Sequence, residues 1–248
     1  MTAKPAPAKP SRARRRWGCA VLLVLLLILA LLIGRLVMQL TATPEYWQTN
    51  RDFLDKTPPP QLAQMAREVE TRLPSEWTQP IGEGSGERKV RVQFDEVNAW
   101  LALRLPQYLE NQDLKLPRQI GQTMLSQRDG ELVLAFDYVS PNWGQRIASI
   151  FVSLAQPEGK PVQLGISRAR AGEQNLPLKY IFNALREVQA FREPPASTVL
   201  DRLSKGEKIE LPPLPVDDHR EAVVRGIEVT PLWIEVDLLV RFTDESKR

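Results

Sequence analysis

Alternating apolar and polar residues mark the start of the stretch RVQFDEVNAWLALRLP at residues 91–106, and a longer period then replaces them. Val90, Val92 and Phe94 alternate with charged or polar residues, which is typical of a strand with one buried face. After Asp95 the apolar residues recur on one side of a helix: Val97, Trp100, Leu101 and Leu105. The pattern therefore predicts a strand that runs directly into a helix.

The polar residues at this junction have a local structural explanation. Asp95 is a typical N-cap residue that can accept a hydrogen bond from the amide of Asn98, and Asn98 can answer as a weaker capping-box partner. Pro106 is expected to end the helix or to kink it. We therefore interpret Asp95, Glu96 and Asn98 as a helix start and not as a catalytic group.

Alternating runs in the second half of the chain predict antiparallel hairpins. The expected strands cover residues 120–127, 131–139, 146–155, 161–171, 221–229 and 232–242. The dipeptide Asp129-Gly130 between the first two strands is a strong signal for a two-residue hairpin turn. In each of the strands expected at 131–139 and 146–155, the apolar side chains share one face. They are Leu132, Leu134, Phe136 and Tyr138 in the former and Ala148, Ile150, Val152 and Leu154 in the latter.

Two helices are expected before the first strand. Thr43 followed by proline looks like an N-cap, and a short helix is expected through about Leu54. Residues 61–73 carry apolar residues at helical spacing, and Pro74 is expected to end that helix. The Gly-rich residues 81–87 form a flexible connection. Two alternatives stay open, because these helices either form a stalk or pack on the domain.

The later part of the chain completes an α+β fold. An apolar stripe over residues 177–191 predicts a helix, and a shorter helix over 197–205 is closed by Gly206 as a C′ residue. Together with the hairpins, these elements predict a long-stranded antiparallel sheet packed against two helices.

The apolar strand faces are the candidate binding region. Long strands with one apolar face need a helix, a second sheet or a ligand to cover that face. Two interpretations stay open: the side chains fill a closed core, or they line a groove for an acyl chain. The groove candidates are Phe94, Trp100, Leu134, Phe136, Tyr138, Ile150 and Val152.

An uninterrupted apolar run lies near the N-terminus. No charged or strongly polar residue occurs from Trp17 to Gly34, and the apolar character resumes after Arg35. This length is close to the roughly 20 residues that a membrane-spanning helix needs, and it exceeds the apolar region of a cleaved signal peptide. We expect a basic tail at 1–16, a transmembrane helix at 17–40, a juxtamembrane stalk or linker at 41–87 and an α+β domain at 88–248.

The charges flanking this run predict its orientation. Six bases and no acid precede it, so the N-terminus is expected in the cytoplasm and the domain outside it. Seven of the 33 Lys and Arg residues lie within residues 1–35, which leaves 26 bases against 30 acids in the remainder. The domain has no clustered basic face, so nucleic acid is not an expected partner.

Candidate chemistry is sparse. Cys19 is the sole cysteine and His219 the sole histidine, so neither a thiol nor a zinc site has enough ligands. His219 follows Asp217-Asp218 in a polar linker and is interpreted as a solvated loop residue. Two carboxylate pairs, Glu131 with Asp137 and Glu235 with Asp237, are interpreted as solvated sheet faces. We expect no metal, no cofactor and no enzymatic activity.

The motifs "FDEVNAWL" and "NLPLKYIFNAL", the paired long strands between them and the late hairpin resemble one protein family. They resemble the YpmS-like membrane-anchored bacterial envelope proteins over about residues 88–242, and more distantly the tubular lipid-binding proteins. The resemblance implies a curved sheet that binds a lipid or another apolar ligand, and it implies no catalytic role for Val97, Asn98 or Leu101. The alternative is a non-catalytic envelope protein that acts through protein contacts.

Overall fold

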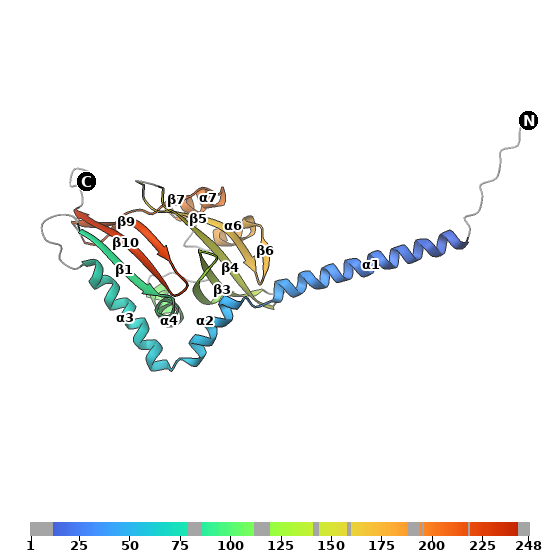
Figure 1. Cartoon of the computed structure of the whole chain (residues 1–248), viewed down its shortest axis with the longest axis horizontal. Coiled ribbons are helices and arrows are strands. Elements are labelled where there is room, and N and C mark those ends of the chain that lie inside the picture. The colour runs from blue at the N-terminus through green and yellow to red at the C-terminus, as the bar shows by residue number, and fades with distance from the viewer. Residues whose placement is uncertain are drawn as a thin grey trace, which may run out of the picture.

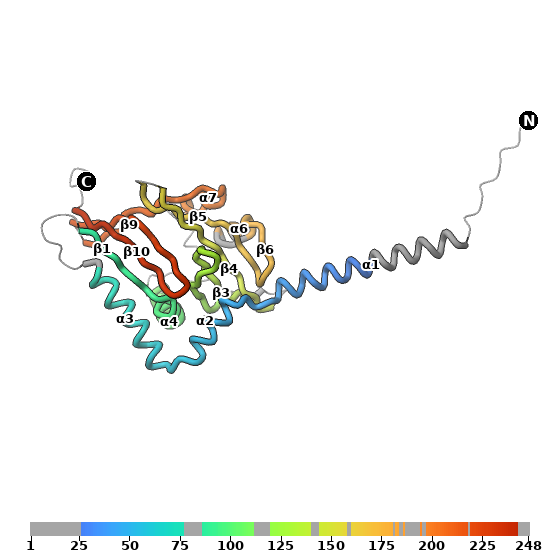
Figure 2. The backbone as a smooth tube through the Cα atoms, in the orientation of Figure 1, coloured from blue at the N-terminus to red at the C-terminus, as the bar shows by residue number. Residues whose placement is uncertain are grey.

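The computed structural model describes residues 12–78, 86–111, 120–140, 144–157, 160–187, 194, 196–217 and 219–242 (Figure 2). The expected basic tail up to residue 11, residues 81–85 of the expected connection and the end of the helix expected over 177–191 lie outside these residues. One long helix points away from an α+β body (Figure 1). The α+β class predicted from sequence is confirmed.

The helices are α1 (Arg12–Thr41), α2 (Glu45–Lys56), α3 (Pro59–Thr78), α4 (Phe94–Leu103), α5 (Leu105–Asn111), α6 (Leu178–Glu187) and α7 (Ala196–Ser204). The strands are β1 (Gly86–Gln93), β2 (Ile120–Arg128), β3 (Glu131–Ser140), β4 (Gly144–Ala155), β5 (Gln163–Ala171), β6 (Gln174–Leu176), β7 (Ile209–Glu210), β8 (Leu214–Pro215), β9 (Arg220–Val229) and β10 (Trp233–Phe242). The Asp129-Gly130 turn is confirmed, with φ of 56° and 80° as a type I′ turn requires.

The strands form two antiparallel sheets and not the single sheet expected from sequence. The four-stranded sheet has the order β1-β10-β9-β8, and the six-stranded sheet has the order β2-β3-β4-β5-β6 with β7 on β5. The division arises because β1 pairs with the last strand, where Val90 lies opposite Val236. The expected packing against two helices is not confirmed, because α2, α3 and α4 all contact strands.

Helix α1 is one rod of 30 residues, about 45 Å long at the rise of an α-helix. By length and composition it can cross a membrane, and the described apolar side chains from Leu26 to Met38 are exposed. It begins at Arg12, so it includes the last residues of the expected basic tail.

The end of α1 is fixed to the turn between β5 and β6. The N–H of Glu173 donates to the carbonyl oxygen of Gln39 at 2.9 Å, and the N–H of Gly172 donates to that of Ile147 at 2.8 Å. Gly172 has φ +57°, and a Cβ there would lie 2.5 Å from the Gln39 oxygen and 2.7 Å from the Ala42 oxygen. Only glycine fits this contact without a shift of α1.

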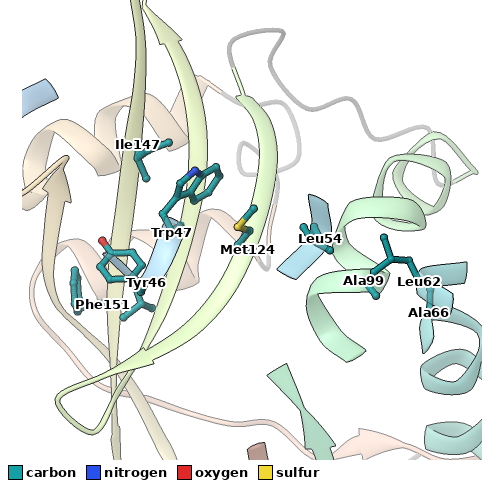
Figure 3. Close-up of a cluster of buried hydrophobic side chains, with 11 residues drawn as sticks. Tyr46, Trp47, Leu54, Leu62, Ala66, Ala99, Met124, Ile147 and Phe151 are labelled. Carbon is teal, nitrogen blue, oxygen red and sulfur yellow. The ribbon is translucent and has the colours of Figure 1, made fainter. Parts of the chain in front are cut away.

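Helices α2 and α3 belong to the body and form a V beneath the sheets (Figures 1 and 2). Their apolar residues enter one buried cluster with strand residues (Figure 3); these are Tyr46, Trp47, Leu54, Leu62 and Ala66. The folded core therefore begins well before residue 88, and α2 and α3 do not form a separate stalk.

Three expected helix boundaries are corrected by the structure. Pro44, not Thr43, is the N-cap of α2. Pro74 lies inside α3 and does not end it. Its ring costs the helix one backbone hydrogen bond, but the helix continues for about one more turn, to Thr78. Gln93, not Asp95, caps α4, so the helix begins at Phe94, two residues earlier than expected. The Phe94 N–H donates to the Leu232 carbonyl oxygen.

Of the two outcomes expected at Pro106, the helix end is observed: α4 ends at Leu103, and a new helix, α5, begins at Leu105. The capping box of α4 joins Gln93 and Glu96, and the Glu96 carboxylate accepts the Gln93 N–H at 3.0 Å. Asn98 therefore takes no part in the cap. Its side chain lies elsewhere and has another function in the fold.

Candidate functional site

The six-stranded sheet has a first face whose centre is buried under α2 and α4. Its residues come from β2, β3 and β4: Met124, Val133, Ala135, Ile147, Ser149 and Phe151. Tyr46 of α2 meets the Phe151 ring edge-on at 6.3 Å between centroids (Figure 3). Small residues at 133 and 135 leave room for the large side chains of α2.

The opposite, second face of this sheet is also apolar. Neighbouring residues of a strand point to opposite faces, so this face carries Leu125, Leu134, Phe136, Tyr138, Ala148, Ile150 and Val152. Leu134 lies opposite both Leu125 and Ile150, and Phe136 lies opposite Ala148. Cross-strand pairs of this kind form one continuous apolar surface.

The second face is covered unevenly. Ile150 is 7% exposed and Ala169 of β5, opposite it, is fully buried. Helix α6 contacts β5 and buries Phe182, and Figure 1 shows α6 and α7 along β5, away from α2 and α3. Toward β2 and β3 the side chains of Leu125, Leu134 and Phe136 are half-buried, and Tyr138 is 37% exposed.

The structure brings five of the seven predicted groove residues together on this face: Leu134, Phe136, Tyr138, Ile150 and Val152. The other two lie on α4. Trp100 packs at the margin of the first-face cluster and donates its Nε1–H to Glu70 at 3.1 Å, and Phe94 is buried at the start of the helix. The fully buried residues of β3 are Val133 and Ala135, one position out of phase with the apolar set seen in the sequence.

Asn98 binds the edge strand β2. Its Oδ1 accepts the Leu125 N–H at 2.7 Å, and its Nδ2 donates to the Leu125 carbonyl oxygen at 2.9 Å. Asn50 of α2 donates to the same oxygen at 3.3 Å. The Asn98 amide thus takes the place of a neighbouring strand, which closes this part of the edge to an added strand. Sequence reasoning missed this role; the signal was an amide beside the apolar side of a helix.

A cluster of arginines borders the first face. Arg168 and Arg170 of β5 lie over the Phe151 ring, at 4.2 and 5.2 Å from its centroid. Arg168 pairs with Glu131 at 3.1 Å and Arg170 pairs with Glu173 at 3.3 Å. The charges balance, so this cluster is not an anion-binding site.

A buried tyrosine lies beside this cluster. The Tyr46 hydroxyl donates to the Ser149 Oγ at 2.7 Å. Burial raises the pKa of Tyr46, and the bond to Ser149 opposes that rise. Tyr46 is therefore a neutral core residue that anchors α2 to β4.

The outer face of the four-stranded sheet is charged. Glu235 accepts hydrogen bonds from Arg91 at 2.7 and 3.0 Å and pairs with Lys89 at 3.4 Å, and Lys89 also pairs with Asp237. Hydrogen bonds from Arg91 hold the pKa of Glu235 below its usual value. Glu235 and Asp237 therefore lie on a charged sheet face, as interpreted, but the Glu235 side chain is only 12% exposed and is less solvated than expected.

The second carboxylate pair lies on one strand face, as expected, but its two members are far apart. Glu131 and Asp137 lie at opposite ends of the first face, six residues apart on one strand, which separates them by about 20 Å. Glu131 binds Arg168, and Asp137 accepts a hydrogen bond from Gln145. Two carboxylates this far apart cannot share one reaction centre.

No group of three metal-binding side chains occurs among the residues that the structure describes. His219 is exposed, and its backbone N–H donates to Asp217 at 2.9 Å. Comparisons of the chain with protein-family models, with curated proteins and with solved structures gave no match. The second face is apolar and is half-buried toward β2 and β3.

Proposed function

We propose that this chain is a single-pass membrane protein whose body lies outside the cytoplasm and binds a lipid or another apolar molecule on its second face. One observation carries the proposal: a sheet whose first face is filled by α2 and α4 presents a second apolar face that is only half-buried at Leu134 and Phe136. Apolar surface of this extent is stabilised when a ligand removes it from water.

The membrane part of the proposal rests on α1. Its 30 residues exceed the roughly 20 needed to span the hydrocarbon core, and bases precede the apolar run. Reporter enzymes that are active only outside the cytoplasm, fused after Phe242, test the orientation. Activity there is expected, and activity of a cytoplasmic reporter at that position would refute the orientation.

The binding part is tested on the full chain. Lipids that remain with the detergent-purified protein are quantified by mass spectrometry, in the wild type and in two matched variants. Leu134→Asp places a charge on the second face, and Leu239→Asp places the same charge at a half-buried site on the charged face of β10. We expect Leu134→Asp to lower the bound lipid about tenfold and Leu239→Asp to leave it unchanged.

A protein partner is the second candidate, favoured by exposed apolar side chains on α4 and α5. Leu103 is 40% and Tyr108 is 53% exposed. Binding through the β2 edge at Leu125 is disfavoured, because Asn98 already occupies that edge. Site-specific photo-cross-linking from position 108 in cells is expected to give one discrete adduct if this candidate holds, and the adduct should persist in Leu134→Asp.

We propose a binding protein and not an enzyme. The resemblance to the membrane-anchored envelope family remains part of the proposal, and the more distant resemblance to tubular lipid-binding proteins implies the apolar ligand. The half-buried second face supports this combination.

A further inference from the structure

The second face ends where α1 joins the body. The Ile147 carbonyl oxygen accepts the N–H of Gly172, the residue in contact with the end of α1. Arg146 precedes Ile147 and lies opposite Tyr138 of β3. Alternation places both Arg146 and Tyr138 on the second face, because Ile147 points to the first. A cation and a phenol therefore stand at the end of the apolar surface nearest α1.

Arg146 is incompletely paired. Its Nη1 donates to the Gln145 carbonyl oxygen at 2.7 Å, but its Nε is buried and has no hydrogen-bond partner among the described residues. The nearest carboxylate along the neighbouring strand, Asp137, points to the first face and accepts from Gln145 instead. A buried guanidinium donor without an acceptor is costly, and arginine is a preferred partner of phosphate.

The apolar residues continue from this point along the strands. Tyr138, Phe136, Leu134 and Leu132 follow one another on β3, over about 20 Å. An acyl chain laid along them would bring its head group to Arg146. Because α1 meets the body at the same end, a head group at this position would lie at the surface of the bilayer that α1 is proposed to cross.

We propose, on the basis of the lipid-binding function above, that Arg146 and Tyr138 bind the phosphate of an anionic phospholipid whose acyl chain lies on Phe136 and Leu134. The positive charge selects anionic over zwitterionic lipid. Because this site lies beside the end of α1, the proposed source of the phosphate is a lipid of the adjoining bilayer and not free phosphate.

The test uses the full chain reconstituted in nanodiscs of equal parts phosphatidylcholine and phosphatidylglycerol. The protein is extracted in mild detergent and its bound lipids are quantified by mass spectrometry. Leu134→Asp keeps α1 and serves as the blank for lipids held around that helix. We expect the wild type to be enriched in phosphatidylglycerol and Arg146→Gln to reduce the enrichment about tenfold, with total lipid unchanged within about twofold.

Two further variants keep the result interpretable. Arg146→Lys retains the charge and should keep most of the enrichment, and Arg225→Gln removes an exposed arginine from β9 of the other sheet and should change nothing. Unchanged enrichment in Arg146→Gln would overturn the head-group assignment and leave lipid binding intact. Wild-type lipid no greater than the Leu134→Asp blank would instead overturn lipid binding itself. Enrichment that free phosphate competes away would assign the site to a soluble anion.

Discussion

The strands of both sheets alternate in sequence, but the faces of the two sheets differ in composition and burial. In the four-stranded sheet, Val90 and Leu238 are buried on one face while Lys89 and Glu235 pair on the other. In the six-stranded sheet, Phe151 on one face is fully buried and Phe136 on the other is half-buried. The four-stranded sheet needs no further cover, since its charged face forms ion pairs and its apolar face is packed. The six-stranded sheet has two faces with apolar centres, and one of them is only half-buried toward β2 and β3.

An apolar ligand would therefore add most to the stability of the fold on the second face of the six-stranded sheet. Covering a charged face with an apolar ligand releases no hydrophobic free energy. Covering a half-buried apolar face stabilises the complex in proportion to the apolar area removed from water.

The largest effect is expected for the matched pair Phe151→Ala and Phe136→Ala. Phe151 is 0% exposed, so its truncation leaves a cavity and should lower the free energy of unfolding by about 3–5 kcal/mol. Phe136 is half-buried, and its truncation should cost about 1 kcal/mol. Urea unfolding of the full chain in detergent measures both. Equal losses would show that the second face is a closed core, and the lipid proposal would lose its surface.

The next effect concerns the amide that holds β2. Asn98→Leu leaves the Leu125 N–H without its acceptor and weakens the pairing of its carbonyl, which should cost about 2–3 kcal/mol. Asn50→Ala removes only the bond at 3.3 Å and should cost less than about 1 kcal/mol. The order of the two urea midpoints decides the matter, and a reversed order would contradict the role given to Asn98.

A smaller effect is expected where the strands meet α1. Gly172→Ala combines positive φ with a Cβ clash against α1 and should cost about 1–3 kcal/mol. Gly130→Ala has a similar φ but open space around its Cβ, so it serves as the control. Hydrogen exchange of the Glu173 amide, which donates to Gln39, should accelerate in Gly172→Ala alone. Equal exchange in both variants would refute the contact with α1.

The smallest effect comes from the charged face. Arg91 lowers the pKa of Glu235, so the folded state binds this proton more weakly than the unfolded chain does. The stabilisation is present above the ordinary carboxyl pKa of about 4.3 and is lost as the pH falls through the lowered value. The urea midpoints of wild type and Glu235→Gln should therefore converge on acidification. A gap that widens toward low pH would have the wrong sign.

Local patterns predicted the local parts of the fold. The turn at Asp129-Gly130 and the strands on either side follow from neighbouring residues, and so does the common face of Leu134 and Phe136. Five of the seven candidate residues were gathered on one face for this reason. Phe94 and Trp100 were expected there as aromatic residues, but both lie on α4.

The distant pairings could not be predicted from those patterns. Lys89 and Glu235 lie 146 residues apart, and Tyr46 and Ser149 lie 103 residues apart. The pairing of β1 with β10 divides the strands into two sheets. The contact of Tyr46 with Ser149 places α2 on the first face of the six-stranded sheet. Asn98 was assigned to a local cap for the same reason, because its partner on β2 lies 27 residues away.

The connection between α1 and α2 sets how far the body can act. Only Ala42, Thr43 and Pro44 separate the two helices, and three extended residues span about 10 Å. With α1 in a bilayer, the tether would be too short for the body to leave the head-group layer. Any soluble molecule would then have to diffuse to the membrane to meet this protein, whereas a lipid would already be within its reach.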